Sequence, residues 1–260
     1  MKTKLLLLLT FIGFNSYSQQ EASFYLSNLS GASGIVSSGD MLYVQSPKKI
    51  YKINTSLNTP DATTIYTPAA DFYITNIAVI GNMIYLSEEN YKADTDTSLG
   101  SRIVAINVNN LSNPINVIYS TTQYVSALAI RHNHIYFSSE TAPDANDDFI
   151  VEIHKIDISI PNPTATVLIS NLTSRKVSDM EFYSNNLLIS VEGKSKVFGF
   201  DVTDETPVVS EYLSGLNSNK GIFVNGNHLF TTEDNKIVAK QLKDFKKDCT
   251  LVIYGFTISG

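Results

Sequence analysis

The chain has 260 residues, of which 43% are hydrophobic and 17% charged, enough apolar material for one domain with a large core. Its 25 Asp and Glu residues outnumber 19 Lys and Arg residues, which gives a formal charge of −6 at pH 7. This balance excludes the basic surface that a nucleic-acid-binding domain requires, so no nucleic-acid partner is expected. The single cysteine, Cys249, excludes an internal disulfide.

Residues 1–18 have the pattern of a secretory signal peptide. Lysines precede an apolar run over residues 5–14, and small residues follow at the expected cleavage site. The run is too short to span a membrane, and no later segment is long and apolar enough to do so. We therefore expect residues 19–260 to be exported, as a secreted, periplasmic or cell-surface protein without a transmembrane segment.

The same pattern then occurs five times: an apolar run, two turn residues, a second apolar run and an acidic or polar end. The copies align, 42, 51, 52 and 42 residues apart, on Tyr43, Tyr85, Tyr136, Leu188 and Phe230. Repeats of this length are typical of four-stranded propeller blades or of helix pairs. No segment of residues 19–260 has an apolar stripe at helical spacing, so the repeat predicts strands.

Each unit contains four expected strands. The first two flank a dipeptide that suits a two-residue type I′ hairpin turn, in which Gly and Asn tolerate positive φ. These dipeptides begin at Gly39, Gly81, His132, Ser184 and Gly226. The third strands are expected at 49–54, 102–107, 152–157, 196–201 and 236–241. The fourth, outermost strands are expected at 63–67, 116–120, 166–170, 209–213 and 250–254.

The sequence thus predicts an all-β propeller over residues 19–260. Its four-stranded blades are expected at about 32–67, 73–121, 124–172, 175–216 and 219–256. Residues 23–30 resemble the outer-strand segment 166–174, which predicts an orphan outer strand at the N-terminus. We expect the five visible blades to belong to a six-bladed ring in a chain that is incomplete at its C-terminus. The alternative is a five-bladed ring with a spare strand.

Two acidic insertions between the second and third strands form the first candidate site. They occupy residues 90–101 and 141–148 and account for the two longer spacings. Their oxygen-rich side chains suit Ca²⁺, although neither insertion has the spacing of an EF-hand loop. The alternative is a pair of solvated acidic loops. The candidate ligand-binding residues are Asp94, Asp96, Asp144, Asp147 and Asp148.

A second candidate site comes from the register of the repeat. Four units carry a carboxylate four residues after the aligning residue, at Glu89, Glu140, Glu192 and Asp234. Because second strands of neighbouring blades end on one face, these side chains should form an arc around the channel mouth. Such an arc could hold a divalent metal or a cationic ligand, and the like charges would raise some of the pKa values. Alternatively, each carboxylate caps its own loop or accepts backbone N–H bonds.

Other chemical motifs are weak. His132 and His134 form a His-x-His pair, but they lie beside a hairpin turn, and His228 occupies the His134 position in the fifth unit. The repeat therefore predicts structural histidines. The sequence contains no Gly-x-Ser-x-Gly nucleophile motif and no Gly-rich phosphate loop.

The phrases GNMIYLSE, KIDIS followed by NP, and FDVTDETP resemble the secreted bacterial propeller repeats of the LVIVD, YVTN and NHL-like types. The resemblance covers about residues 23–260 and implies that the loops between second and third strands lie on the ligand-binding face. Gluconolactonase-like propellers share this architecture and bind one divalent metal in the central channel. The resemblance to that family implies that Glu89 or Asp179 could play such a part, but the family's full set of metal ligands is not assigned to residues of this chain.

The expected function is therefore that of an exported, non-enzymatic scaffold without a cofactor. It would present the loops between second and third strands to a protein, peptide or polysaccharide. The alternative is a metal-dependent hydrolase of the gluconolactonase-like kind, in which the carboxylate arc holds the divalent metal.

Overall fold

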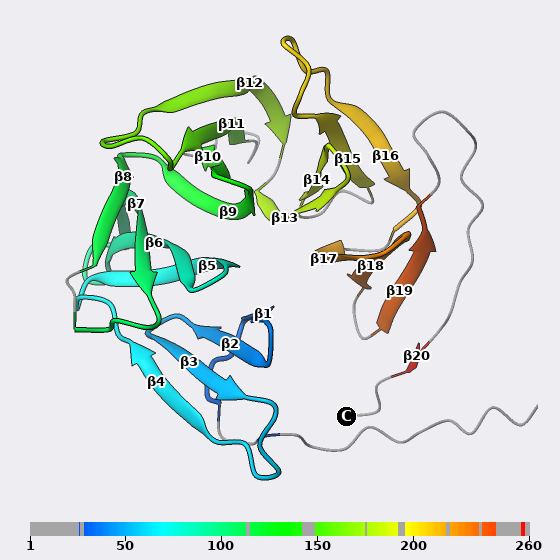
Figure 1. The fold of residues 1–260 in the computed structure, drawn as a ribbon. Helices are drawn as coiled ribbons and strands as arrows, with labels where there is room; N and C mark the ends of the chain where they lie inside the picture. Colours follow the sequence, from blue (N-terminus) through cyan, green and yellow to red (C-terminus); the bar gives the residue numbers. More distant parts are fainter. Residues whose placement is uncertain are drawn as a thin grey trace, which may run out of the picture.

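A computed structural model describes residue 26 and residues 29–112, 115–141, 149–174, 176–191, 196–216, 219–233, 236–242 and 256–257. Within these ranges the regular secondary structure consists of β-strands alone. The strands form five four-stranded antiparallel sheets arranged in a ring (Figure 1). The protein is therefore an all-β propeller, as the repeat predicted. No helix long and apolar enough to cross a membrane occurs in these ranges.

In each blade the strands follow chain order from the innermost to the outermost. Blade 1 contains β1 (Gly34–Ser38), β2 (Met41–Ser46), β3 (Lys49–Asn54) and β4 (Ala62–Tyr66). Blade 2 contains β5 (Phe72–Ile80), β6 (Met83–Lys92), β7 (Thr97–Asn107) and β8 (Asn116–Thr121). Blade 3 contains β9 (Tyr124–Arg131), β10 (His134–Glu140), β11 (Phe149–Asp157) and β12 (Ala165–Ser174).

The last two blades repeat this order. Blade 4 contains β13 (Val177–Tyr183), β14 (Asn186–Val191), β15 (Lys196–Asp201) and β16 (Ser210–Ser214). Blade 5 contains β17 (Asn219–Asn225), β18 (His228–Glu233), β19 (Lys236–Gln241) and β20 (Phe256–Thr257).

The core lies in the seams between consecutive blades. Four apolar clusters each join two neighbouring blades, so most central strands are buried on both faces. The aligning residues of the first four units are buried in these seams: Tyr43, Tyr85, Tyr136 and Leu188. The aligning residue of blade 5, Phe230, is only half-buried, because no blade follows it in the described part of the chain.

The inner hairpin turns occur at the predicted dipeptides but differ in class from the prediction. Positive φ is found only at the first loop residue of each turn, at Gly39, Gly81, His132, Ser184 and Gly226. A type I′ turn needs positive φ at both loop residues, whereas a type II′ turn needs it at the first alone. The prediction of type I′ turns was therefore wrong, and two of these turns hold a side chain in the left-handed region.

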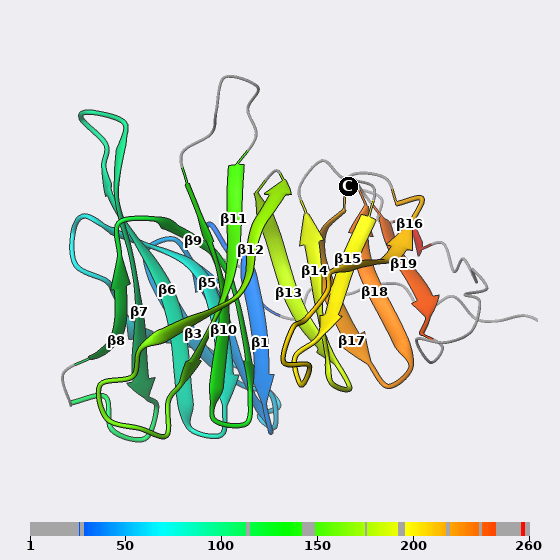
Figure 2. The ribbon, with the colours of Figure 1, turned by 90° about the horizontal axis from the view of Figure 1, so that it is seen from above.

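All blades point the same way, so the molecule has two distinct ends (Figure 2). We call the end with the inner hairpin turns the turn face. We call the opposite end the loop face; there the second strands end and the innermost strands begin. The acidic insertion of blade 2 extends β6 and β7 into a long hairpin at the loop face.

Several expectations fall on residues outside the described ranges. Of the expected orphan strand 23–30, only residues 26, 29 and 30 are described, and none of them is in a strand. The outermost strand of blade 5, β20, follows the predicted segment 250–254, which is not described, and pairs with β19. The signal peptide and a sixth blade stay predictions.

Candidate binding groove between blades 2 and 3

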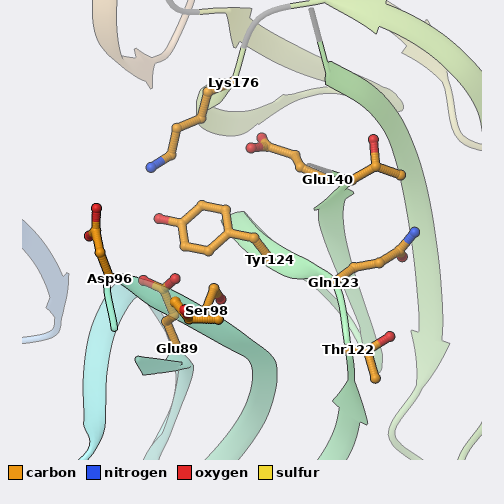
Figure 3. Close-up of a pocket in the computed structure, with 10 residues that line it drawn as sticks. Glu89, Asp96, Ser98, Thr122, Gln123, Tyr124, Glu140 and Lys176 are labelled. Atoms are coloured by element: carbon orange, nitrogen blue, oxygen red, sulfur yellow. The ribbon is translucent and has the colours of Figure 1, made fainter. Parts of the chain in front are cut away.

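A pocket of about 720 Å³ lies on the loop face at the seam between blades 2 and 3 (Figure 3). It is formed by the end of β6, the β6–β7 hairpin, the β8–β9 connection, the end of β10 and the residue before β13. We call it the groove. Its lining residues are Glu89, Asp96, Thr97, Ser98, Thr122, Gln123, Tyr124, Glu140, Thr141 and Lys176.

A glycine in β7 sets the position of one wall. Gly100 has a φ of +111°, and a Cβ at this position would lie 2.2 Å from the carbonyl oxygen of Thr121 and 2.7 Å from the Cα of Thr122. Any larger residue would therefore clash with rigid backbone. The absence of a side chain lets the β8–β9 connection pack against β7, which places Thr122 and Gln123 in the groove.

The structure brings two members of the predicted arc, Glu89 and Glu140, to this groove, but they differ in environment. Glu140 is 2% exposed, and its Oε1 accepts hydrogen bonds from the Ser126 hydroxyl and, at 2.8 Å, from the Val177 backbone N–H. It therefore joins blade 3 to the first residue of β13, which is the structural alternative considered above. Glu89 is half-buried and lines the groove wall.

Of the two described aspartates in the acidic insertion of blade 2, one lines the groove. Asp96 lies in the β6–β7 turn with a φ of +51°, and the Tyr91 hydroxyl donates a hydrogen bond to its Oδ1. This contact holds the carboxylate at the groove. Asp94 is exposed and is not among the groove-lining residues.

The most informative groove residues, Tyr124 and Lys176, are ones that the sequence reasoning missed. The Lys176 ammonium lies 4.3 Å from the centroid of the Tyr124 ring, a cation–π contact that connects blades 3 and 4. Both residues lie twelve positions before the aligning residue of their own unit, as does Tyr73 in blade 2. That shared register is the signal that could have found them.

Burial raises the pKa of Tyr124, an effect that Lys176 opposes and that Glu89 and Glu140 reinforce. The phenol therefore stays protonated at neutral pH and offers a hydrogen-bond donor inside the groove. Together with the Thr, Ser and Gln side chains of the wall, it equips the groove to bind a polar ligand through hydrogen bonds.

Asp179, the other residue implied as a metal ligand, ties blade 4 to blade 5. Its Oδ2 accepts the Ile222 N–H at 2.9 Å, and its Oδ1 accepts the Met180 N–H at 2.9 Å. Burial raises its pKa to about 7, and the two backbone hydrogen bonds oppose this rise. Both oxygens are thus engaged with backbone amides.

Five predicted site residues lie outside the described ranges: Glu192, Asp234, Asp144, Asp147 and Asp148. Among the residues that are described, no three His, Cys, Asp or Glu side chains are grouped so that they could hold a metal ion. His132 lies in a turn with a φ of +51°, and His134 begins β10, as the repeat predicted.

One buried polar cluster has the residue types of a catalytic triad but not its geometry. The Ser139 hydroxyl lies 2.8 Å from His154 Nε2, and Glu152 Oε2 lies 3.3 Å from the same nitrogen. In a triad the carboxylate and the nucleophile bind opposite ring nitrogens. Ser139 is also only 1% exposed, so this cluster is structural.

No protein-family model matches the chain, and no curated protein matches it significantly in sequence. Several solved structures share the fold. A chain of a nidogen/laminin complex is 15% identical with a TM-score of 0.60, over 78% of this chain and 72% of that one. The tricorn protease is 13% identical with a TM-score of 0.59, over 83% of this chain but only 26% of the protease.

A luciferin-regenerating enzyme is also similar, with 12% identity and a TM-score of 0.57 over 86% of this chain and 75% of that one. At these identities the similarity concerns the fold alone. The chain is thus similar to proteins that include enzymes and a member of a protein complex. The propeller fold by itself does not decide between binding and catalysis.

Proposed function

We propose that this protein is a non-enzymatic binding scaffold, and that its binding site is the groove on the loop face between blades 2 and 3. One observation carries the proposal: loops from blade 2, blade 3 and the start of blade 4 converge on a single pocket lined by hydroxyl, amide, phenol and carboxylate groups. Function in rigid repeat folds commonly lies on such loops.

Two further expectations from the sequence complete the proposal. The signal-peptide pattern of residues 1–18 supports a location outside the cytoplasm, as a secreted, periplasmic or cell-surface protein. The repeat phrases resemble those of LVIVD, YVTN and NHL-like propellers. An exported scaffold of this type would bind a protein, a peptide or a polysaccharide.

The metal-dependent hydrolase remains the competing hypothesis, and the geometry favours the scaffold over it. Glu140 Oε1 and Asp179 Oδ2 accept backbone N–H groups of the following blade, so these two oxygens stabilise the ring. A hydrolase would need such carboxylates for a metal.

A binding panel tests the proposal. Residues 19–260 would be labelled and applied to an array of peptides and to a set of soluble oligosaccharides. We expect wild-type binding to be lost in Tyr124→Leu, which removes the ring and hydroxyl from the groove. A matched variant, Asn82→Ala, changes an exposed residue on the turn face and should bind like the wild type.

The proposal would be overturned if no member of the panel binds, or if Asn82→Ala and Tyr124→Leu affect binding equally. A thermal-shift series with Ca²⁺ and Zn²⁺ tests the competing hypothesis. A metal-dependent rise in Tm that disappears in Glu89→Gln would favour the hydrolase.

A further inference from the structure

The charges around the groove are unbalanced. Among the described residues that line it, Glu89, Asp96 and Glu140 contribute three carboxylates, and Lys176 contributes one ammonium. A concave site with an excess of one sign focuses its electric field and concentrates ions of the opposite sign. The groove should therefore attract cations and repel anionic ligands.

The ring of Tyr124 already holds a cation. Lys176 and this ring project into the same space as the carboxylates of Glu89 and Asp96 (Figure 3), and the ammonium is 4.3 Å from the ring centroid. An ammonium above an aromatic face and beside carboxylates is a favourable arrangement for a primary amine. The chain thus shows, with its own side chain, which chemical group this surface accommodates.

We propose that the groove binds a lysine side chain of a peptide or protein partner, and that Lys176 occupies the ring of Tyr124 until the ligand's ammonium replaces it. This inference deepens the proposed function and rests on it. A lysine is chosen over other amines because the precedent in the structure is a lysine side chain that reaches over the ring from the start of blade 4.

The proposal predicts that one substitution in the groove strengthens ligand binding, where a loss would be the usual result. If Lys176 competes with the ligand, then removing its charge should strengthen binding, because the carboxylates and the ring become available. A groove that bound an anion would lose affinity in the same variant, and a groove that bound a neutral sugar would gain nothing from the loss of charge. The sign of the effect therefore identifies the ligand's charge.

Fluorescence anisotropy with a labelled pentapeptide, acetyl-Gly-Gly-Lys-Gly-Gly, provides the test. We expect binding that weakens when salt is raised and disappears when the peptide lysine is acetylated. Lys176→Met should tighten binding about two- to tenfold. The double variant Glu89→Gln/Asp96→Asn should weaken it about tenfold or more.

A matched control is available on the same protein. Lys155 lies 6.0 Å from the centroid of the Tyr136 ring and does not line the groove. Lys155→Met removes the same charge elsewhere and should leave the affinity unchanged. Circular dichroism of each variant would confirm that the fold is retained.

Three results would overturn the inference. The first is no binding of the lysine peptide by either the wild type or Lys176→Met. The second is a loss of affinity in Lys176→Met, or an equal gain in Lys155→Met. The third is stronger binding of a glucosamine trimer, which would assign the amine to a sugar. If neutral members of the panel still bind in a Tyr124-dependent way, the proposed function survives while this inference fails.

Discussion

On the loop face, the seam between blades 1 and 2 is closed by charged groups, whereas the seam between blades 2 and 3 leaves its charged groups around a groove. At the first seam, Glu88 is fully buried and binds the Tyr66 hydroxyl at 2.5 Å and the Arg102 guanidinium at 2.7 Å. Lys48 donates to two backbone carbonyls at the entry to blade 2. At the second seam, Glu89 and Tyr124 line the groove.

Glu88 and Glu89 are neighbours in the sequence, and strand geometry separates their roles. Successive side chains of β6 point to opposite faces of the sheet. Glu88 therefore faces Tyr66 of blade 1, and Glu89 faces the groove beside blade 3. The acidic end of one strand thus supplies a structural carboxylate to one seam and an available carboxylate to the next.

The largest expected effect breaks the closed seam. Arg102→Met leaves the buried Glu88 carboxylate without its cationic partner, which should lower the free energy of unfolding by ~3–5 kcal/mol. Urea denaturation would measure this loss. The matched control is Lys196→Met, which breaks a pair of 2.5 Å with Glu211 whose side chains are 45% and 41% exposed. That control should cost much less, because both side chains are largely exposed and water screens the pair. Equal losses of unfolding free energy in the two variants would contradict the assignment of Glu88 and Arg102 as a buried, stabilising ion pair.

The next effect concerns the seam between blades 4 and 5, where the tying carboxylate is Asp179. Its pKa is raised to about 7 in the fold, mainly by burial, whereas an unfolded aspartate titrates near ~3.9. Between these values the folded protein binds more protons than the unfolded chain. The stability contributed by the protonated group is therefore present at low pH and is lost as pH rises through about 7.

Asp179→Asn should remove this pH dependence of the free energy of unfolding. The amide NH2 group replaces one of the two oxygens that accept backbone N–H bonds, so the variant loses one hydrogen bond at every pH. Its stability relative to the wild type should be ~1–2 kcal/mol higher at pH 8 than at pH 4, because the wild type carries the buried charge at pH 8. Unfolding free energies of the wild type and the variant at the two pH values measure it. The same stability difference between variant and wild type at pH 4 and at pH 8 would contradict the raised pKa of Asp179.

The smallest effect lies on the turn face, away from both seams. His132 holds a side chain in the left-handed region at a φ of +51°. His132→Gly should raise the free energy of unfolding by ~0.5–1 kcal/mol, because glycine adopts this conformation without strain. Gly81→Ala makes the reverse change at the equivalent turn residue (φ +56°) and should lower it. Unchanged urea midpoints in both variants would contradict the turn assignment.

The repeat register predicted the propeller and the turn positions, because alternation and spacing are properties of the chain alone. It also placed Glu89 and Glu140 at one position, but it could not say that Glu140 would be buried against Val177 N–H. The difference in burial between Glu89 and Glu140 depends on where the first residue of the next blade lies relative to each carboxylate. The contact between Tyr124 and Lys176 was missed because it joins two blades through side-chain orientations that spacing does not determine.

Blocking the groove tests the central claim most directly. In a Cys249→Ser background, Ser98→Cys would be modified with a bulky maleimide, and binding of the panel's best ligand would be measured. A second conjugate at Asn82→Cys, on the turn face, serves as the control. We predict that the Ser98 conjugate loses affinity about tenfold or more while the Asn82 conjugate binds like the unmodified protein. Retained binding in the Ser98 conjugate would contradict the assignment of the groove as the binding site.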